Sequence, residues 1–168
     1  LFRSRGEWFD WTFRDPITVW DAAATIAAVG RAVPMITGSL ITMIRDGPAE
    51  IPVTLFTPEN MVQGSFEWDI TLWNPNDYDS LELTYTDPAT GYQQEQVLVT
   101  LPGGTTNYPN QITLSGIADR TMAYRYGLYL LAIQRYVREN IVFETGLEGY
   151  IPSYGDLIAV SHDATEWA

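Results

Sequence analysis

Apolar and polar side chains alternate loosely along the first fourteen residues of the chain. The alternating positions of this stretch are occupied by the large apolar side chains of Trp8, Phe9, Trp11 and Phe13. A period of two is typical of a β-strand that buries one face. The pattern therefore predicts an N-terminal strand, with its pairing partner upstream of the first residue.

A helical period follows Asp15-Pro16. The Thr18 side chain can cap free backbone amides, and Asp21 lies near the positive end of the helix dipole. Apolar residues then recur at helical spacing. They are Val19, Trp20, Ala23, Ile26 and Ala27. The pattern predicts a helix that ends at Gly30 and places Trp20 in the core.

Two apolar runs rich in β-branched residues flank Thr37-Gly38-Ser39. This arrangement predicts a β-hairpin, followed by a turn at Asp46-Gly47-Pro48. A short strand is expected from Val53 to Phe56. The helix and the hairpin together predict an N-terminal lobe over residues 1–59, which we expect to be incomplete.

From Gly64 onward several segments alternate apolar and polar positions, as the strands of a half-buried sheet do. Consecutive segments predict an antiparallel meander over residues 65–73, 80–86 and 92–101. The last two of them are separated by strong turn chemistry in the sequence Asp87-Pro88-Ala89-Thr90-Gly91. Shorter strands are expected at residues 111–114, 140–146 and 156–163.

The clearest helical period runs from Ala118 to Arg138, with Asp119 as the expected N-cap. Its apolar face consists of Met122, Ala123, Tyr126, Leu130, Ile133 and Val137. The predicted fold class is α+β. The helix-plus-hairpin lobe is followed, over residues 60–168, by a small antiparallel β-barrel with this one amphipathic helix packed on it.

The charge balance narrows the possible functions. Acidic residues number 21 against nine basic ones, all arginine, so the formal net charge is −12 and specific binding to nucleic acid is disfavoured. The chain has no cysteine and one histidine, which excludes disulfides, thiolate metal sites and multi-histidine metal sites. No apolar run approaches the roughly 18 to 20 residues of a membrane span. We predict no cofactor, no metal and no catalytic residue.

Carboxylates and the single histidine are the candidates for hydrolytic chemistry. Glu67 and Asp69 share one face of a predicted strand, which leaves a glycoside or cell-wall hydrolase as an alternative. A solvated sheet surface shows the same pattern. His162 lies between Ser161 and Asp163, and adjacency argues against a catalytic triad, because neighbours on an extended chain point to opposite faces.

Aromatic residues near a polar loop support a second alternative. Trp73 and Tyr78 flank an Asn/Asp-rich segment and could stack on sugar rings, as in a carbohydrate-binding module. The oxygens of that segment belong to Asn74, Asn76, Asp77 and Asp79. Their order does not match a helix-loop-helix calcium motif, so an ordinary Asx-rich turn is favoured.

The arginines of the second helix are candidate assembly contacts. The guanidinium group binds carboxylates of a neighbouring chain in a planar, bidentate fashion. The residues concerned are Arg120, Arg125, Arg135 and Arg138. An ordinary solvated helix face is the alternative interpretation.

The succession of segments resembles a known family. TVWDAAATIAAVGRAVPMITGSLITMIRDGP, LFTPENMVQGSFEWD, LELTYTDPATGYQ, DRTMAYRYGLYLLA and VFETGLEGYIPSYGDLIAVSHD together resemble the central region of tailed-phage tail tip proteins of the lambda host-specificity type, which also occur in prophages and gene transfer agents. The resemblance covers residues 12–163. Its most specific parts are Asp119-Arg120, FETGLEG and GDLIAVSHD. Tyr154 departs from the family, which often has proline before the Gly-Asp pair.

The resemblance implies a structural role without catalysis. It implies a tail tip or baseplate hub component that links the tail tube to host-attachment elements. Its expected partners are other copies of itself in a homotrimer, neighbouring tail proteins and, through domains outside this chain, the host surface. The expected location is the virion tail tip, after synthesis in the bacterial cytoplasm. We further hypothesise that Glu67, Asp69 and Glu82 face the axial channel and repel passing DNA.

Overall fold

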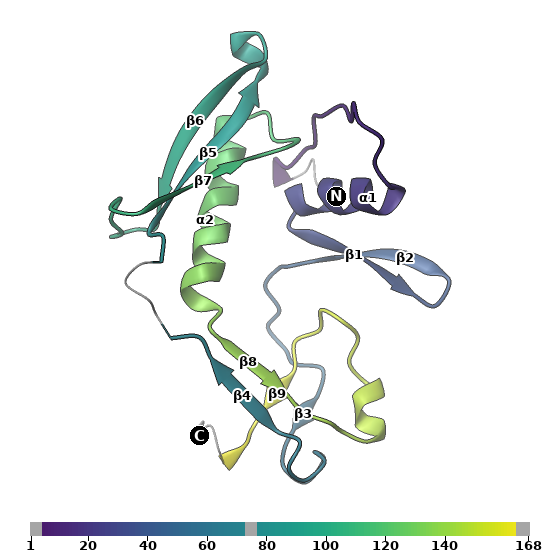
Figure 1. The fold of residues 1–168 in the computed structure, drawn as a ribbon. Coiled ribbons are helices and arrows are strands. Elements are labelled where there is room, and N and C mark those ends of the chain that lie inside the picture. The colour runs from purple at the N-terminus through teal and green to yellow at the C-terminus, as the bar shows by residue number, and fades with distance from the viewer. Residues whose placement is uncertain (1–4, 73–76, 164–168) are drawn as a thin grey trace. The chain divides into compact units, whose positions relative to one another are not determined.

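The chain has an α+β fold. A computed structural model describes residues 5–72 and 77–163 and shows, among them, two α-helices and nine strands (Figure 1). The strands form four small sheets, in the orders β1-β2, β3-β9, β4-β8 and β6-β5-β7. One compact unit comprises Leu1–Met43 and Trp73–Val137, and a second comprises Ile44–Leu72 and Arg138–Ala168. No described helix is long and apolar enough to span a membrane.

The first unit is built on a three-stranded sheet covered by a helix. Strand β5 (Ser80–Asp87) pairs with antiparallel β6 (Gln93–Thr100) and with parallel β7 (Pro109–Thr113). Helix α2 (Arg120–Tyr136) lies along one face of this sheet (Figure 1). The buried side chains between them include Leu81, Leu83, Tyr85, Val97, Val99, Met122, Ala123 and Leu131. The predicted helix and its Asp119 cap are confirmed, with the Met122 amide 2.9 Å from the Asp119 carboxylate. Its predicted apolar face is only partly right, because Ile133 and Val137 are exposed while Gly127 and Leu131 are buried.

A glycine on α2 allows the helix to approach the sheet closely. A Cβ atom placed at Gly127 would lie 2.6 Å from Leu83 Cδ1 and 2.9 Å from Val99 Cγ2. Real Cβ atoms essentially never come this near to another carbon. The helix backbone therefore sits directly on the side chains of β5 and β6, and no other residue type fits at this position without displacing them.

The predicted N-terminal helix and hairpin are confirmed. Helix α1 (Val19–Val29) begins at Thr18, whose hydroxyl oxygen accepts the Asp21 amide at 3.1 Å. Strands β1 (Ala32–Thr37) and β2 (Leu40–Arg45) form the hairpin. The core position predicted for Trp20 is wrong, because its side chain is 41% exposed.

The predicted N-terminal strand does not form in the described residues 5–14. Part of this segment is held by aromatic packing. The Phe9 ring covers Gly116, where a Cβ atom would lie 2.2 Å from the ring, and it stacks on Phe13 with centroids 5.9 Å apart. The Asp10 amide donates to the Gly116 carbonyl at 2.9 Å. Aromatic side chains at alternate positions thus find contacts on a loop rather than in a sheet.

The second unit contains short strands from distant parts of the chain. Strand β3 (Leu55–Phe56) pairs in parallel with β9 (Ala159–Val160), and β4 (Glu67–Ile70) pairs antiparallel with β8 (Glu139–Val142). The Phe56 side chain is 2% exposed and packs on Phe143, with ring centroids 5.0 Å apart. Two 3₁₀ turns complete the described elements, Pro88–Thr90 in the first unit and Leu147–Tyr150 in the second.

The predicted meander and closed barrel are wrong: the described residues form no barrel. Strand β4 pairs with β8 and not with the following strand β5. Alternation along β4 and β5 indicates the strands themselves, but it carries no information on their partners. Strand β7 also departs from a meander, because it runs parallel to β5. The domain boundary predicted near residue 59 stays a prediction.

The loop that returns the chain from β6 to β7 is anchored by Asp79. Its carboxylate accepts hydrogen bonds from the Thr105 hydroxyl, from the amides of Asn107 and Tyr108 at 2.9 and 3.0 Å, and from the Ser80 hydroxyl at 3.0 Å. These bonds, with the one from Thr105 contributing most, lower the pKa of Asp79 from 3.8 to about 2. One carboxylate thus fixes the loop that allows β7 to lie parallel to β5.

We predict that Gly127→Ala destabilises the protein. Alanine raises intrinsic helix propensity by about 1 kcal/mol. Overpacking against Leu83 and Val99 costs roughly 1–3 kcal/mol. The net free energy of unfolding should therefore fall, measured as a lower urea midpoint. Thr121→Ala, at an exposed position of α2, is the matched control and should leave the midpoint unchanged or slightly higher. Equal stability of Gly127→Ala and wild type would contradict the close approach.

We predict that Asp79→Asn weakens the β6–β7 loop in a pH-dependent way. The pKa of Asp79 is lower in the folded protein than its ordinary 3.8, so its charge stabilises the fold above about pH 4. This contribution disappears as the pH falls from about 4 towards 2. Hydrogen exchange at the Asn107 and Tyr108 amides should be faster in Asp79→Asn at pH 6, and the difference from wild type should shrink at low pH. Asp69→Asn, on β4, is the charge-matched control. Unchanged exchange in Asp79→Asn would refute the anchoring role.

Candidate functional site

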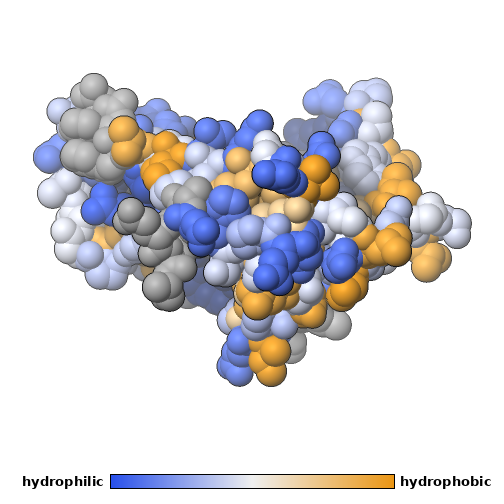
Figure 2. Space-filling view, turned by 90° about the horizontal axis from the view of Figure 1, so that it is seen from below, coloured by the Kyte–Doolittle hydropathy of each residue, from blue (hydrophilic) through white to orange (hydrophobic). Residues whose placement is uncertain are grey.

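The hairpin β1–β2 exposes an unusual amount of apolar surface in the first unit. The exposed fractions are 55% for Val33, 60% for Ile36, 67% for Leu40, 65% for Ile41 and 48% for Met43. We call these five residues, which lie on both faces of the hairpin because side chains alternate along a strand, the apolar hairpin surface. Figure 2 shows from one side that apolar residues reach the surface of the molecule in several places. Exposed groups of this kind mark sites of protein association, and an isolated two-stranded hairpin is only marginally stable in water.

A polar face of the three-stranded sheet points away from α2. Glu82, Thr84 and Thr86 on β5 alternate with the buried side chains that face the helix. Their cross-strand partners on β6 include Gln94 and Gln96. The structure therefore places Glu82, a predicted channel-facing acid, on this polar face. Its carboxylate accepts a hydrogen bond of 2.7 Å from the Gln111 side-chain amide.

Glu67 and Asp69, the other predicted channel-facing acids, share one exposed face of β4 in the second unit. They lie opposite Val142 and Asn140 of β8. Trp68, between them, is half-buried, and its indole N–H lies 3.3 Å from the Glu139 carboxylate. The described residues contain no group of three acidic or histidine side chains that could hold a metal ion.

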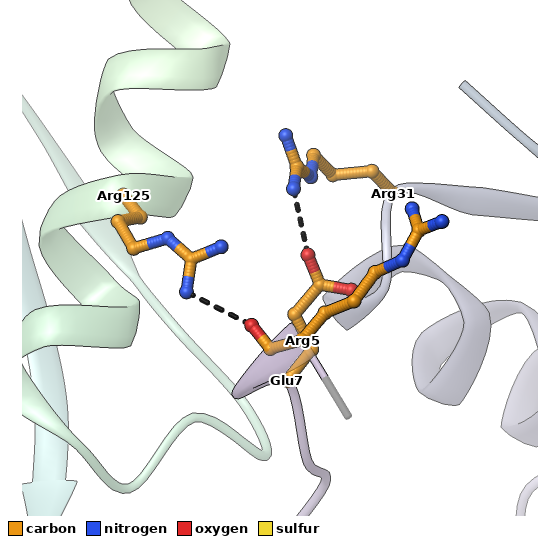
Figure 3. A network of polar contacts seen from close by, with 4 residues as sticks. All are labelled: Arg5, Glu7, Arg31 and Arg125. Carbon is orange, nitrogen blue, oxygen red and sulfur yellow. Dashed lines mark hydrogen bonds and ion pairs between the residues drawn. The ribbon is translucent and has the colours of Figure 1, made fainter. Parts of the chain in front are cut away.

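The predicted assembly arginines are spread over different surfaces. At about 100° per residue, Arg125 and Arg135 lie about 140° and about 60° around α2 from Arg120. Arg125 donates to the Arg5 carbonyl at 3.1 Å (Figure 3). Arg138 follows α2 and belongs to the second unit, where it donates to the Thr71 carbonyl at 3.3 Å. The four residues do not form a single row, and their role in assembly stays a prediction.

Sequence reasoning missed a buried ion pair in the first unit. The Glu7 carboxylate is buried and lies 2.6 Å from the Arg31 guanidinium (Figure 3). The guanidinium carbon also lies 5.4 Å from the centroid of the Tyr129 ring on α2, in cation–π contact. This pair joins the N-terminal segment, the end of α1 and the middle of α2. Nothing in the local pattern around Glu7 signals its burial.

Arg31 also has an unusual backbone conformation. Its φ is +55°, in the left-handed region, whereas Gly30 has an ordinary φ of −91°. Helices commonly end with a glycine in the left-handed conformation, because a side chain is strained there. In this chain the strained position is occupied by arginine, and the ion pair with Glu7 and the ring of Tyr129 hold it there. Gly30 ends the helix as predicted, but the reversal of direction occurs one residue later.

The candidates for hydrolysis and sugar binding, His162 and Tyr78, pack against other side chains. His162 follows β9 and stacks on Phe66, with ring centroids 3.9 Å apart and planes 3° from parallel. Tyr78 is half-buried and packs against the core of the first unit. Trp73, Asn74 and Asn76 lie outside the described residues.

Comparisons with known proteins agree on one kind of protein. The family model Phage-tail_3, described as "Putative phage tail protein", matches residues 18–168. The chain is 31% identical over 156 residues to the tip attachment protein J of Escherichia phage SECphi27, covering 90% of this chain and 13% of that protein. The crystal structure of the tail protein from Neisseria meningitidis MC58 has the same fold over 92% of this chain, with a TM-score of 0.67 and 14% identity. This chain covers 48% of that structure, so it spans only part of both relatives.

Proposed function

Because this chain belongs to the family of phage tail proteins, we propose that it is a structural part of a tail tip or baseplate hub. Its membership of that family confirms the resemblance seen in the sequence. The family is one of tail structural proteins and not of enzymes. Membership of a phage tail family implies a location in the virion tail. The similarity to a tip attachment protein supports a position between the tail tube and the elements that attach to the host.

The apolar hairpin surface is the observation that carries this proposal. Burying an aliphatic side chain completely contributes about 1.5–3 kcal/mol. Association itself costs on the order of 4–15 kcal/mol. Five half-exposed aliphatic residues, Val33, Ile36, Leu40, Ile41 and Met43, thus supply a substantial part of that cost. We propose that this surface is covered by another copy of the protein in a homotrimer, with neighbouring tail proteins beyond it.

A second element of the proposal concerns the acidic residues. Glu67 and Asp69 are exposed on β4, and the whole chain carries a formal charge of −12. Carboxylates that line a channel repel the phosphates of DNA, most strongly at low salt. We propose that Glu67, Asp69 and Glu82 act in this way when DNA passes along the tail axis.

We predict that Ile36→Thr combined with Ile41→Thr prevents assembly. Threonine keeps the β-branched shape and replaces part of the apolar surface by a hydroxyl. If each change costs the interface about 1.5 kcal/mol, subunit association weakens by about 100-fold. The measurement is the amount of the substituted full-length protein in purified virions, together with their titre.

Leu98→Thr is the matched control for this experiment. Leu98 lies on the polar face of the sheet with a 52% exposed side chain, so its replacement removes similar apolar surface elsewhere. The control should assemble normally. Normal incorporation and titre of the double hairpin variant would rule out the apolar hairpin surface as the assembly contact.

We predict that charge reversal of the acids slows DNA ejection. Virions with Glu67→Lys, Asp69→Lys and Glu82→Lys should eject DNA more slowly than wild type in low salt, because the ammonium groups attract phosphate. Adding salt should restore the rate. The control replaces the same residues by glutamine, asparagine and glutamine. If ejection from the lysine virions is as fast as from wild type in low salt, the acids do not line the channel.

A further inference from the structure

The first unit contains an open cleft that its proposed tail function does not use. The cleft has a volume of about 790 Å³ and lies between residues 10–17 and the end of the β5–β6 hairpin. Its walls combine three aromatic rings, those of Trp11, Phe13 and Tyr92, with polar side chains that include Arg14 and Gln94. Small-molecule sites in proteins usually measure roughly 300–1,000 Å³ and have such mixed linings. We propose that this cleft binds a neutral carbohydrate.

Two of the aromatic rings are exposed in a way that suits a sugar. The side chain of Trp11 is 45% exposed, and that of Tyr92 is 66% exposed. A pyranose ring has an apolar C–H face surrounded by hydroxyl groups. An exposed aromatic ring covers the apolar face, and its polar edge stays in water or bonds a hydroxyl. Trp11 and Tyr92 come from distant parts of the chain, so the fold itself brings them to one cleft.

The wall that carries Trp11 is fixed on both sides. Phe9 covers Gly116 and stacks on Phe13, and the Asp10 amide donates to the Gly116 carbonyl at 2.9 Å. Gly116 has a φ of +83° and leaves no room for a Cβ atom beneath the Phe9 ring. The backbone on either side of Trp11 is therefore held before any ligand arrives, which lowers the entropic cost of binding.

Tyr92 is held in a strained backbone conformation. Its φ is +63°, a region that residues with bulky side chains rarely adopt, and the preceding Gly91 has a φ of +77°. The Tyr92 amide donates to the Asp87 carbonyl at 2.9 Å, which closes the hairpin end. Asparagine or glycine would fit this turn with less strain. A large, exposed and strained aromatic residue is explained when its ring has a function, because strain of this kind gathers at binding sites.

The polar side chains of the cleft are available to a ligand. Within the described part of the chain, the side chains of Asp10, Arg14 and Gln94 make no hydrogen bond or ion pair. Carboxylates accept hydrogen bonds, the guanidinium donates them and the amide does both, which matches hydroxyl groups that donate and accept. The two carboxylates, Asp10 and Asp15, outnumber the single guanidinium, and the chain is strongly acidic. This balance favours a neutral sugar over an anionic one.

The test follows the Trp11 indole N–H signal in a two-dimensional ¹H–¹⁵N spectrum of the whole chain. The six tryptophans give separate indole signals, and Trp11→Phe assigns one of them. Cellotriose, maltotriose and chitotriose are titrated as probes. The proposal expects a saturable shift of the Trp11 signal with at least one of them. Absence of any saturable shift with all three overturns it.

Three variants separate binding from folding. Trp11→Ala should weaken binding by about ten-fold, the loss of one aromatic contact. Tyr92→Asn should weaken binding by about five-fold while the unfolding midpoint stays equal or rises, because the strained ring is removed. Trp20→Ala, which removes an indole that is 41% exposed on α1, is the matched control and should bind as wild type does. Wild-type affinity in both cleft variants overturns the site even if some sugar binds elsewhere.

Discussion

The close contact between α2 and the sheet is the constraint on which the first unit depends. Gly127 lets the helix backbone rest on Leu83 and Val99, and the side chains on either side of this contact fill the core. With one sheet face covered in this way, the polar side chains of β5 and β6 necessarily face outward. The same helix carries Tyr129, against which Arg31 packs, so the N-terminal segment is ordered through α2 as well.

Capping and turn signals in the sequence predicted local structure correctly. The caps at Thr18 and Asp119 and the turn around Gly38 depend on neighbouring residues and are found as expected. The family could also be recognised, because the order of its segments is distinctive. What failed was long-range: the partner of β4, the parallel course of β7 and the packing of the N-terminal aromatics depend on contacts that no short pattern encodes.

In the candidate sites, too, local features could be predicted from the sequence and long-range contacts could not. The exposure of Glu67 and Asp69 agrees with their predicted polar face, but Ile70 on the opposite face of β4 is exposed as well, which alternation does not predict. The apolar hairpin surface was visible as two apolar runs, but their exposure was not, because a buried strand and an associating strand have the same composition. The cleft brings together Trp11 and Tyr92, which are far apart along the chain, so no local pattern in the sequence indicates it. The left-handed conformations of Arg31 and Tyr92 are equally invisible in the sequence.

Each unit is assembled from two separate stretches of chain, and this arrangement affects how the protein can fold during synthesis. Strand β4 leaves the ribosome well before its partner β8, and β3 well before its partner β9. The nascent chain therefore holds residues of the second unit unpaired while the first unit completes itself with α2. Chaperones that act in that interval would shield the unpaired strands of the second unit from aggregation.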